Sequence, residues 1–326
     1  MKRSRSESQM AFFDTIRAVE KERDSRIWCI VHSGRGHICY PAMSSLLTGR
    51  DAIGKGERIE ILLHSPGGHP DIAYRAMKFF RRRFKEVNVI VPLVAKSAAT
   101  LMCLAADKIF MGEFAELGPI DIQIDDQVQH GAKNFSPLNE FKSIEFMREQ
   151  AIEWMDYYAV VMNANYGISL KEALRDSVPL VGALMRPMFE QIEPLSMGEH
   201  RRALAISEEY AKQMIALTGN SNAAEIVRKI VWDYPSHEFC IDCEEALALG
   251  LPVKSLSDAH DRLLTKAITN LDKDSLYHGF APAETQHHPE QPMPGSKSAA
   301  PSPSPRPTKR VNGRSSAGEE ERLKSA

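Results

Sequence analysis

The sequence predicts an α/β fold built on a parallel sheet. Three apolar segments, 26–33, 58–65 and 87–95, have the length and composition of buried strands. The last of them is almost entirely apolar, which is typical of a strand covered on both faces. Helical segments separate the strands, and repeated strand–helix–strand units of this length connect parallel strands. We therefore expect a central parallel sheet with helices on both sides.

The segments between these strands carry the helical pattern. Residues 40–47 predict a short helix, and residues 71–84 predict a longer one in which apolar side chains recur at helical spacing. Residues 98–107 are small and apolar and predict a buried helix, and 108–112 predict a further short strand. Strands and helices thus alternate through the first third of the chain.

The chain is predicted to be mostly helical over residues 138–228. Two long helices are expected there, over 141–163 and 196–219. The second is expected to begin with a capping box, in which Ser196 and Glu199 would satisfy each other's backbone N–H groups.

Composition divides the chain into four predicted regions. Residues 1–24 form a polar, helical extension, 25–257 the main domain, 258–278 a short helical segment and 279–326 a tail. The tail contains eight of the 19 prolines and almost no large apolar residues. It cannot bury enough surface to offset the entropy of ordering, so we expect it to be disordered.

Charge, cysteine content and missing motifs limit the classes of function. The chain has 41 basic and 43 acidic residues, which gives no reason to expect a nucleic-acid partner. Five cysteines without disulfide spacing suggest a reducing, cytoplasmic location. The most apolar window, 87–106, contains Pro92 and Lys96, so no transmembrane segment is expected. No phosphate loop, dinucleotide motif or metal-spaced carboxylate cluster is present, and we expect neither a cofactor nor a metal.

The stretch "HSPGG" places two glycines directly after the second predicted strand. Pro66 fixes one backbone dihedral, while Gly67 and Gly68 permit conformations that other residues avoid. At a strand end, this arrangement can aim a backbone N–H group into a cleft where an oxyanion would bind. The alternative is a tight turn that needs glycine only for steric reasons.

Ser97 lies between the predicted strand 87–95 and the predicted helix 98–107. Its hydroxyl would then be at a helix start, with the N–H group of Ala98 beside it, which is a suitable place for a nucleophile. The alternative is an ordinary helix-capping serine.

These motifs, followed by "AADKIFMG", "LGPIDIQI" and "EEALALGLPV", resemble the serine dehydrogenase proteinase family of the Clp/crotonase superfamily. More distantly, the chain is similar to the Clp protease proteolytic subunit and to signal peptide peptidase A. The resemblance covers residues 26–255. It implies a Clp/crotonase-like spiral of parallel βαβ units that forms a homo-oligomer and cleaves peptide or protein substrates. Ser97 would be the nucleophile, and the N–H groups of Gly68 and Ala98 would form the oxyanion hole. Ala99 departs from the glycine that relatives often carry there.

The general base is the open part of this prediction. The segment that carries the Clp histidine corresponds to residues 117–124, which contain no histidine. Signal peptide peptidase A uses a lysine instead, and both Lys142 and Lys133 are candidates here. Lys142 is preferred, because burial among its apolar neighbours would lower its pKa from about 10.4 toward 7–8. Lys96 is expected to point away from the site. His64 is a third candidate, and we expect it to hydrogen-bond the glycine turn instead.

Two other functions remain open from the sequence. The first is a crotonase-like acyl-CoA enzyme, which uses paired N–H groups to hold a thioester enolate and a glutamate as acid or base, here Glu113 or Glu116. The second is a catalytically inactive oligomeric scaffold of the same fold. We rank both below the serine peptidase.

Overall fold

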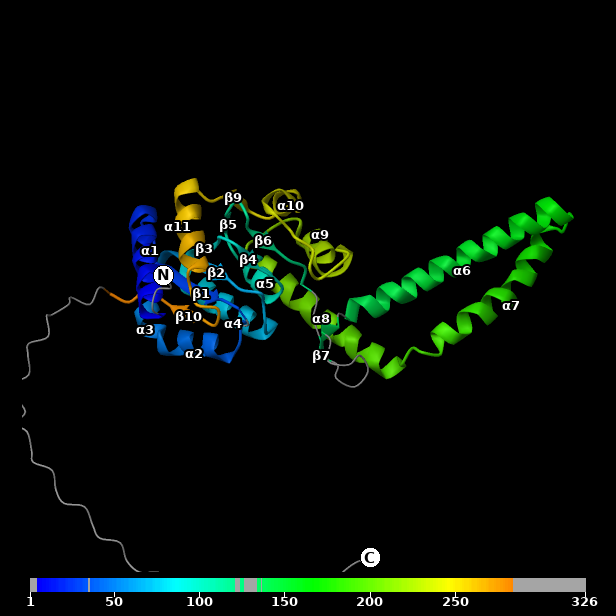
Figure 1. Cartoon of the computed structure of the whole chain (residues 1–326), viewed down its shortest axis with the longest axis horizontal. Helices are drawn as coiled ribbons and strands as arrows, with labels where there is room; N and C mark the ends of the chain where they lie inside the picture. Colours follow the sequence, from blue (N-terminus) through cyan, green and yellow to red (C-terminus); the bar gives the residue numbers. More distant parts are fainter. Residues whose placement is uncertain (1–4, 35, 121–123, 126–133, 136, 284–326) are drawn as a thin grey trace, which may run out of the picture. The chain divides into compact units, whose positions relative to one another are not determined.

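The computed structural model describes residues 5–34, 36–120, 124–125, 134–135 and 137–283 (Figure 1). The chain separates into one compact unit, Met1–Ala283, and a second unit, Glu284–Ala326. The predicted disordered tail therefore lies almost entirely outside the described residues. The four predicted domain boundaries stay predictions.

A six-stranded, mostly parallel sheet forms the centre of the first unit, which confirms the predicted α/β fold. The strand order is β10-β1-β2-β3-β5-β9. Neighbouring strands from β1 to β9 run parallel, whereas β10 is antiparallel to β1. The strands are β1 (Ile27–His32), β2 (Gly56–His64), β3 (Phe84–Val91), β5 (Lys108–Met111), β9 (Val253–Ser255) and β10 (Leu276–Gly279).

Helices cover both faces of this sheet, because the buried strands are apolar on both sides. In β1, Ile27, Cys29 and Val31 join one apolar core, while Trp28 and Ile30 join the other. The first core includes side chains of α1 (Arg5–Arg23) and α11 (Asp258–Thr269), which lie beside each other in Figure 1. The second core is formed with α2 (Tyr40–Thr48), α4 (Pro70–Arg81), α5 (Ala98–Cys103) and α8 (Pro194–Ala216).

The region 138–228 is mostly helical, as predicted. Helices α6 (Pro137–Tyr166) and α7 (Leu170–Phe189) pack on each other, and we call them the α6–α7 hairpin. The remaining helical elements are α3 (Arg50–Ile53), α9 (Ala223–Arg228), the π-helical turn η1 (Lys229–Asp233) and α10 (Cys243–Ala248). None of the described helices combines the length and apolar character needed to span a bilayer.

Two local predictions are wrong. Helix α8 begins at Pro194, and its N-cap is Glu193, whose carboxylate accepts the N–H of Ser196. The capping box therefore does not form, because proline at the first helical position moves the start two residues earlier. The predicted helical segment 258–278 contains α11 but ends in strand β10, which pairs with β1.

Four short strands complete the fold. They pair as β4 with β6 in parallel and as β7 with β8 in antiparallel orientation. Their bounds are β4 (Val94–Ala95), β6 (Glu116–Leu117), β7 (Ile124–Asp125) and β8 (Asn134–Phe135).

Candidate active site

Ser97 lies between strand β4 and helix α5 and is the N-cap residue of that helix. Its backbone has φ 52° and ψ −117°. In the described part of the chain, Asp24 is the only other residue besides glycine with positive φ. A residue with a side chain is strained in this conformation, and such outliers concentrate at functional sites. A strained strand-to-helix turn of this kind presents the nucleophilic serine of many hydrolases.

The Ser97 hydroxyl does not cap its own helix. An N-cap serine ordinarily accepts a hydrogen bond from a backbone N–H of the first helical turn. The Ser97 side chain makes no such bond, and it is half buried. Ser97 thus occupies the N-cap position, but the alternative interpretation that its hydroxyl caps the helix is wrong, and the hydroxyl is available for another partner.

The two glycines of the turn are required by space as well as by dihedral angle. Gly67 has φ +119° and Gly68 has φ +137°. A Cβ atom on Gly67 would lie 2.8 Å from the Cβ of Ser97, and one on Gly68 would lie 2.2 Å from the carbonyl oxygen of Ile38. Both distances are shorter than real Cβ contacts. Gly67 thus allows the backbone of this turn to approach Ser97 directly, a contact that the sequence did not reveal.

Backbone hydrogen bonds of Ser65 hold the glycine turn against the segment that carries Ser97. The N–H of Ser65 donates to the carbonyl of Val94 (2.8 Å), and the N–H of Lys96 donates to the carbonyl of Ser65 (3.1 Å). Ser65 and Ala95 therefore form a parallel bridge, two residues before Ser97. The two turns that the sequence placed far apart are joined at this bridge.

The amides of Gly68 and Ala98 are not used by the fold. Gly68 forms a parallel bridge with Ile38, in which Gly67 and His69 make the hydrogen bonds, so the Gly68 N–H is left over. The N–H of Ala98 is at the first position of α5, where no intrahelical acceptor exists. Within the described residues, neither N–H donates a hydrogen bond. Both are free to bind an oxyanion.

The candidate lysines lie in different surroundings. The Nζ of Lys96 pairs with carboxylates of Glu116 (3.2 Å) and Glu238 (3.8 Å), so its charge is already used by ion pairs. Lys142 is on α6 with 52% of its side chain exposed, and its Nζ pairs with Glu145 (3.2 Å). The expected burial of Lys142 is therefore absent in the single chain, because the helix presents it to solvent. Lys133 lies outside the described residues.

His64, the third candidate base, does not hydrogen-bond the turn as predicted. Its Nδ1 is buried without a partner in the described part of the chain. Burial lowers the pKa of His64 to about 4, so its ring is neutral at pH 7. Side chains alternate along β2, and Leu62 belongs to the core with α1 and α11, so His64 faces that side. The glycine turn is instead hydrogen-bonded by the side chain of Ser65, which in turn contacts His32.

The two glutamates of the acyl-CoA alternative lie in different surroundings. The Glu116 carboxylate is paired with Lys96, as described above. Glu113 is exposed in the loop after β5, where its N–H donates to Asp261 (3.1 Å). Among the described residues, no group of three or more metal-ligating side chains is arranged around an ion site.

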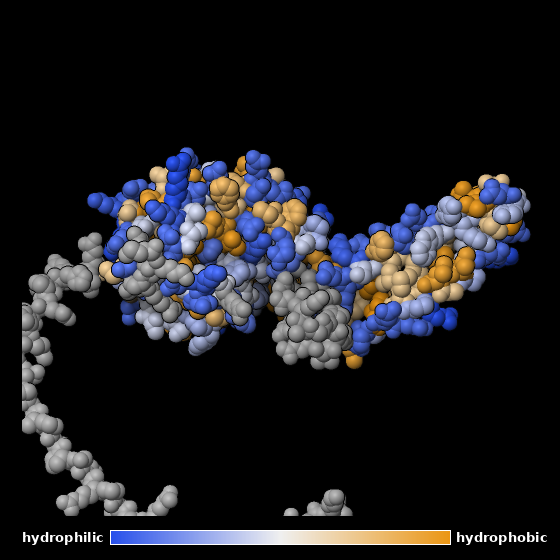
Figure 2. All heavy atoms as spheres, in the orientation of Figure 1, coloured by the Kyte–Doolittle hydropathy of each residue, from blue (hydrophilic) through white to orange (hydrophobic). Residues whose placement is uncertain are grey.

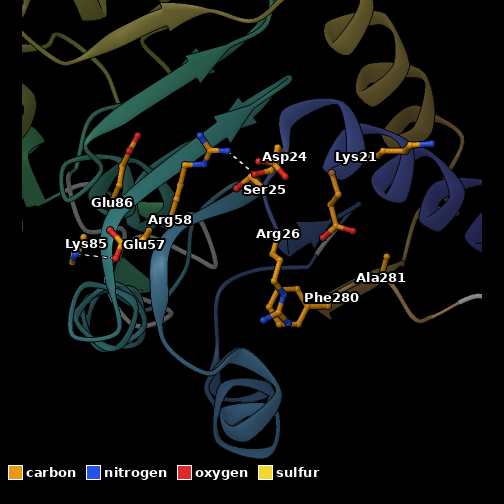
Figure 3. Close-up of a pocket in the computed structure, with 11 residues that line it drawn as sticks. Lys21, Asp24, Ser25, Arg26, Glu57, Arg58, Lys85, Glu86, Phe280 and Ala281 are labelled. Carbon is orange, nitrogen blue, oxygen red and sulfur yellow. Dashed lines mark hydrogen bonds and ion pairs between the residues drawn. The ribbon is translucent and has the colours of Figure 1, made fainter.

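One large pocket lies away from Ser97. It has a volume of about 990 Å³ and lies where strands β1, β2 and β3 begin, beside Arg26, Arg58 and Glu86 (Figure 3). The glycine turn and Ser97 follow the carboxyl ends of the parallel strands, at the opposite edge of the sheet. Arg58 donates to the carbonyls of Arg23 and Asp24, so its charge is already used by the fold.

Residues 2–135 match the family model described as ClpP-like SDH-type serine proteinase. This match confirms the predicted resemblance over that part of the chain, which includes Gly68, Ser97 and Ala98. Lys142 lies beyond it.

Two curated relatives are proteins of Methanocaldococcus jannaschii that carry the names uncharacterized protein MJ0137 and MJ1495. The first is 32% identical over 126 residues, 36% of this chain and 44% of the relative. The second is 26% identical over 119 residues, 33% of this chain and 41% of the relative. The chain thus spans less than half of the length of these relatives.

Two solved structures are also similar. One is a mutant of ClpP1 from Listeria monocytogenes, with 20% identity and a TM-score of 0.25, over 49% of this chain and 83% of that one. The other is a mutant of the membrane-bound stomatin-specific protease 1510-N, with 15% identity and a TM-score of 0.27, over 46% of this chain and 68% of that one.

Proposed function

We propose that this chain, which resembles ClpP-like serine proteinases over residues 2–135, is a serine peptidase with Ser97 as its nucleophile. One observation carries the proposal. Ser97 is held at φ 52° in a strand-to-helix turn, its hydroxyl is not used as a cap, and it lies against Gly67. A fold that only needed a capped helix would not hold a serine in this strained conformation.

The proposed reaction follows from this arrangement. The Oγ of Ser97 attacks the carbonyl carbon of the scissile peptide bond and gives its proton to the base. The carbonyl oxygen becomes an oxyanion, which the N–H groups of Gly68 and Ala98 bind. Each such donor contributes about 3–4 kcal/mol to transition-state stabilisation in acyl-transfer enzymes. The C–N bond then breaks, the amine leaves with a proton, and water hydrolyses the acyl-enzyme.

A lysine base completes the proposed mechanism. A lysine can accept the serine proton only when it is neutral, which requires removal from water or a neighbouring positive charge. Lys142 is half exposed and paired with Glu145 in the single chain, so it does not meet this condition there. We therefore propose that Lys142 becomes the base in a homo-oligomer, with Lys133 as the alternative.

The surface of the α6–α7 hairpin supports the homo-oligomer. Figure 2 shows apolar side chains gathered along it, and a surface of this kind marks an interaction site. The large apolar side chains exposed on the hairpin are Phe146, Ile152, Trp154, Tyr157, Val160, Tyr166, Leu170, Leu174, Val178, Leu180, Leu184 and Phe189. Lys142 is on the same hairpin, and the proposal requires that assembly over this surface also removes Lys142 from water.

An electrophilic serine probe tests the proposal. A fluorophosphonate should label the wild-type protein at Ser97, and peptide mass spectrometry would locate the adduct. Ser97→Ala should abolish labelling and lower peptide hydrolysis by at least about 10³-fold. Ser45→Ala, which removes a hydroxyl that donates to the helix carbonyl of Pro41, is the control and should retain both.

The same assay distinguishes the two candidate lysine bases and the alternative functions. Lys142→Ala should lower hydrolysis by about 10²–10⁴-fold, whereas Lys133→Ala should have little effect. The reverse result would move the base to Lys133. Full activity in Ser97→Ala would reject the serine mechanism. Absence of both labelling and hydrolysis in the assembled wild type would favour the inactive scaffold, and binding of acyl-CoA would favour the crotonase-like enzyme.

The cytoplasmic location stays a prediction.

A further inference from the structure

The side chain of Ser65 closes the glycine turn from within the protein. Ser65 is fully buried, and its Oγ accepts the N–H of Gly67 (3.1 Å). The same oxygen lies 3.2 Å from the carbonyl oxygen of Gly67, to which the hydroxyl can donate. A serine bonded to the backbone two residues later forms a turn that defines the intervening dihedral angles. Ser65 therefore fixes the backbone conformation of the turn that leads into Gly68.

Ser65 is itself held by a histidine from the neighbouring strand. His32 ends strand β1, is 1% exposed, and places its Nδ1 2.8 Å from the Oγ of Ser65. Its other nitrogen, Nε2, lies 2.6 Å from the Nε2 of His278 on strand β10. The two rings are nearly perpendicular, with 4.9 Å between their centroids and an interplanar angle of 84°. A continuous polar chain thus runs from His278 through His32 and Ser65 to Gly67.

Burial favours the neutral form of both histidines in the folded protein. Burial lowers the pKa of His32 to about 3 and also lowers the pKa of His278. Two neutral rings can share one proton between their facing nitrogens, whereas two charged rings would repel. Each group in the chain then has a donor or acceptor that matches its neighbour. Polar chains that are fully satisfied in a buried environment hold a single arrangement.

We propose that Ser65, His32 and His278 are positioning residues that hold the Gly68 amide in place opposite Ser97. The proposal rests on the proposed function, because it assigns the amide to the oxyanion hole. It also gives strand β10 a role in catalysis. His278 lies 246 positions after His32 in the chain and well beyond the residues that match the peptidase family.

The arrangement makes a specific kinetic prediction. An oxyanion hole acts in the transition state, so a displaced amide lowers kcat and leaves KM nearly unchanged. Displacements of about 1 Å at an active site cost on the order of 10²-fold in rate. Ser65→Ala leaves the buried N–H of Gly67 without its acceptor and should lower kcat by about 10–100-fold.

His278 offers a matched pair of substitutions. His278→Phe keeps the ring but removes the nitrogen that faces His32, and it should lower kcat by about 3–10-fold. His278→Gln keeps a polar group at that position and should restore most of the activity. Since Ser65 and His278 act through one turn, Ser65→Ala with His278→Phe should lose less than the product of the single effects. Ser207→Ala on α8, where the serine is 1% exposed, is the control for loss of a buried hydroxyl and should keep wild-type kcat.

Hydrogen exchange of the full-length protein supplies a readout that does not depend on activity. Mass spectrometry should show faster exchange over residues 64–69 in Ser65→Ala and His278→Phe, but not in His278→Gln or Ser207→Ala. Wild-type kcat in Ser65→Ala, additive losses in the double variant, or unchanged exchange at this turn would overturn the proposal.

The two proposals fail in different ways. If the wild type has no activity and no labelled Ser97, the proposed function is rejected. The exchange pattern then decides whether the polar chain fixes the turn: faster exchange in the two variants supports it, and unchanged exchange overturns it.

Discussion

The carboxyl edge of the sheet and the α6–α7 hairpin differ in how far their side chains are buried and paired within one chain. At the sheet edge, Ser65 is fully buried and hydrogen-bonded through both its backbone and its side chain. On the hairpin, large apolar side chains are exposed, and Lys142 forms only a solvent-exposed ion pair with Glu145 among the described residues.

This difference suggests a division of the proposed catalytic machinery. The nucleophile and the two amides need a fixed geometry, and the sheet of a single chain supplies it through backbone bonds. A lysine base needs a low-dielectric environment, which the isolated hairpin does not provide. We therefore expect the first part to be present in every chain and the second to depend on assembly.

Between the sheet edge and the hairpin, the larger effect is expected at the sheet edge, from Gly67→Ala. The new Cβ would lie 2.8 Å from the Cβ of Ser97, and alanine is strained at φ +119°. We expect at least about 100-fold lower kcat/KM, measured by peptide hydrolysis, from displacement of the turn. We also expect the free energy of unfolding to fall by about 1–3 kcal/mol.

Gly219→Ala is the matched control for this backbone strain. Gly219 has φ +69° but no atom within 4 Å of an added Cβ. Gly219→Ala should lower the free energy of unfolding by about 1 kcal/mol and leave hydrolysis unchanged. Equal activity in the two variants would show that the approach of Gly67 to Ser97 has no catalytic consequence.

A second prediction concerns the hairpin, through Val178→Asp combined with Leu184→Asp. These side chains are 56% and 54% exposed in the single chain, so the change should cost little in the monomer. Two buried carboxylates at an interface would dissociate the oligomer, and light scattering would show a monomer. Hydrolysis should fall by at least about 10-fold because Lys142 returns to water.

Leu247→Asp on α10, at a position 61% exposed, is the control and should leave the assembly intact. A fully active monomeric wild type would contradict the division between sheet and hairpin. The base would then have to come from the same chain.

The buried histidines predict a third effect, on stability against pH. His64 is neutral when folded because burial lowers its pKa from 6.5 to about 4. The unfolded chain binds more protons below pH 6.5, so stability is complete above that pH and falls as pH drops toward 4. Between pH 7 and 5, His64 should account for about 2 kcal/mol of lost unfolding free energy.

Urea denaturation at pH 7 and pH 5, at one protein concentration, measures this loss. His64→Phe should flatten the dependence, whereas His237→Phe, a change at the half-buried histidine in the loop before α10, is the histidine control. If the dependence were the same in His64→Phe and the wild type, His64 would not be buried as described.

The smallest expected effect is at the ion pair on the hairpin. Lys142 and Glu145 have 52% and 46% of their side chains exposed, so Glu145→Gln should change the unfolding free energy by less than about 0.5 kcal/mol in the monomer. Thermal denaturation of the monomeric Val178→Asp, Leu184→Asp variant, with and without Glu145→Gln, measures this change in unfolding free energy. A larger loss in the assembled protein than in the monomer would show that the pair becomes buried on assembly.

Local pattern was sufficient to predict the sheet and the strand-to-helix turn at Ser97. Strands β1, β2 and β3 begin and end within one to four residues of their predicted bounds, and the last part of the predicted strand 87–95 is the separate strand β4. These elements could be predicted because apolar runs and helical spacing are local properties. Proline and the glycine pair likewise identified the turn at 66–68, and Ser97 was found because it falls between a strand and a helix. A serine two residues before Gly67 was a signal for the side-chain turn that the prediction missed.

The sequence by itself determined that this chain forms a parallel α/β sheet with a glycine turn and a serine at its carboxyl edge. Only the tertiary structure decided that Ser65 joins the two turns, that His278 contacts His32 beside Ser65, and that Lys142 faces solvent. The physical reason is that hydrophobic period and backbone freedom depend on neighbouring residues. Contacts between β1 and β10, or the environment of one helix face, depend on how distant segments pack.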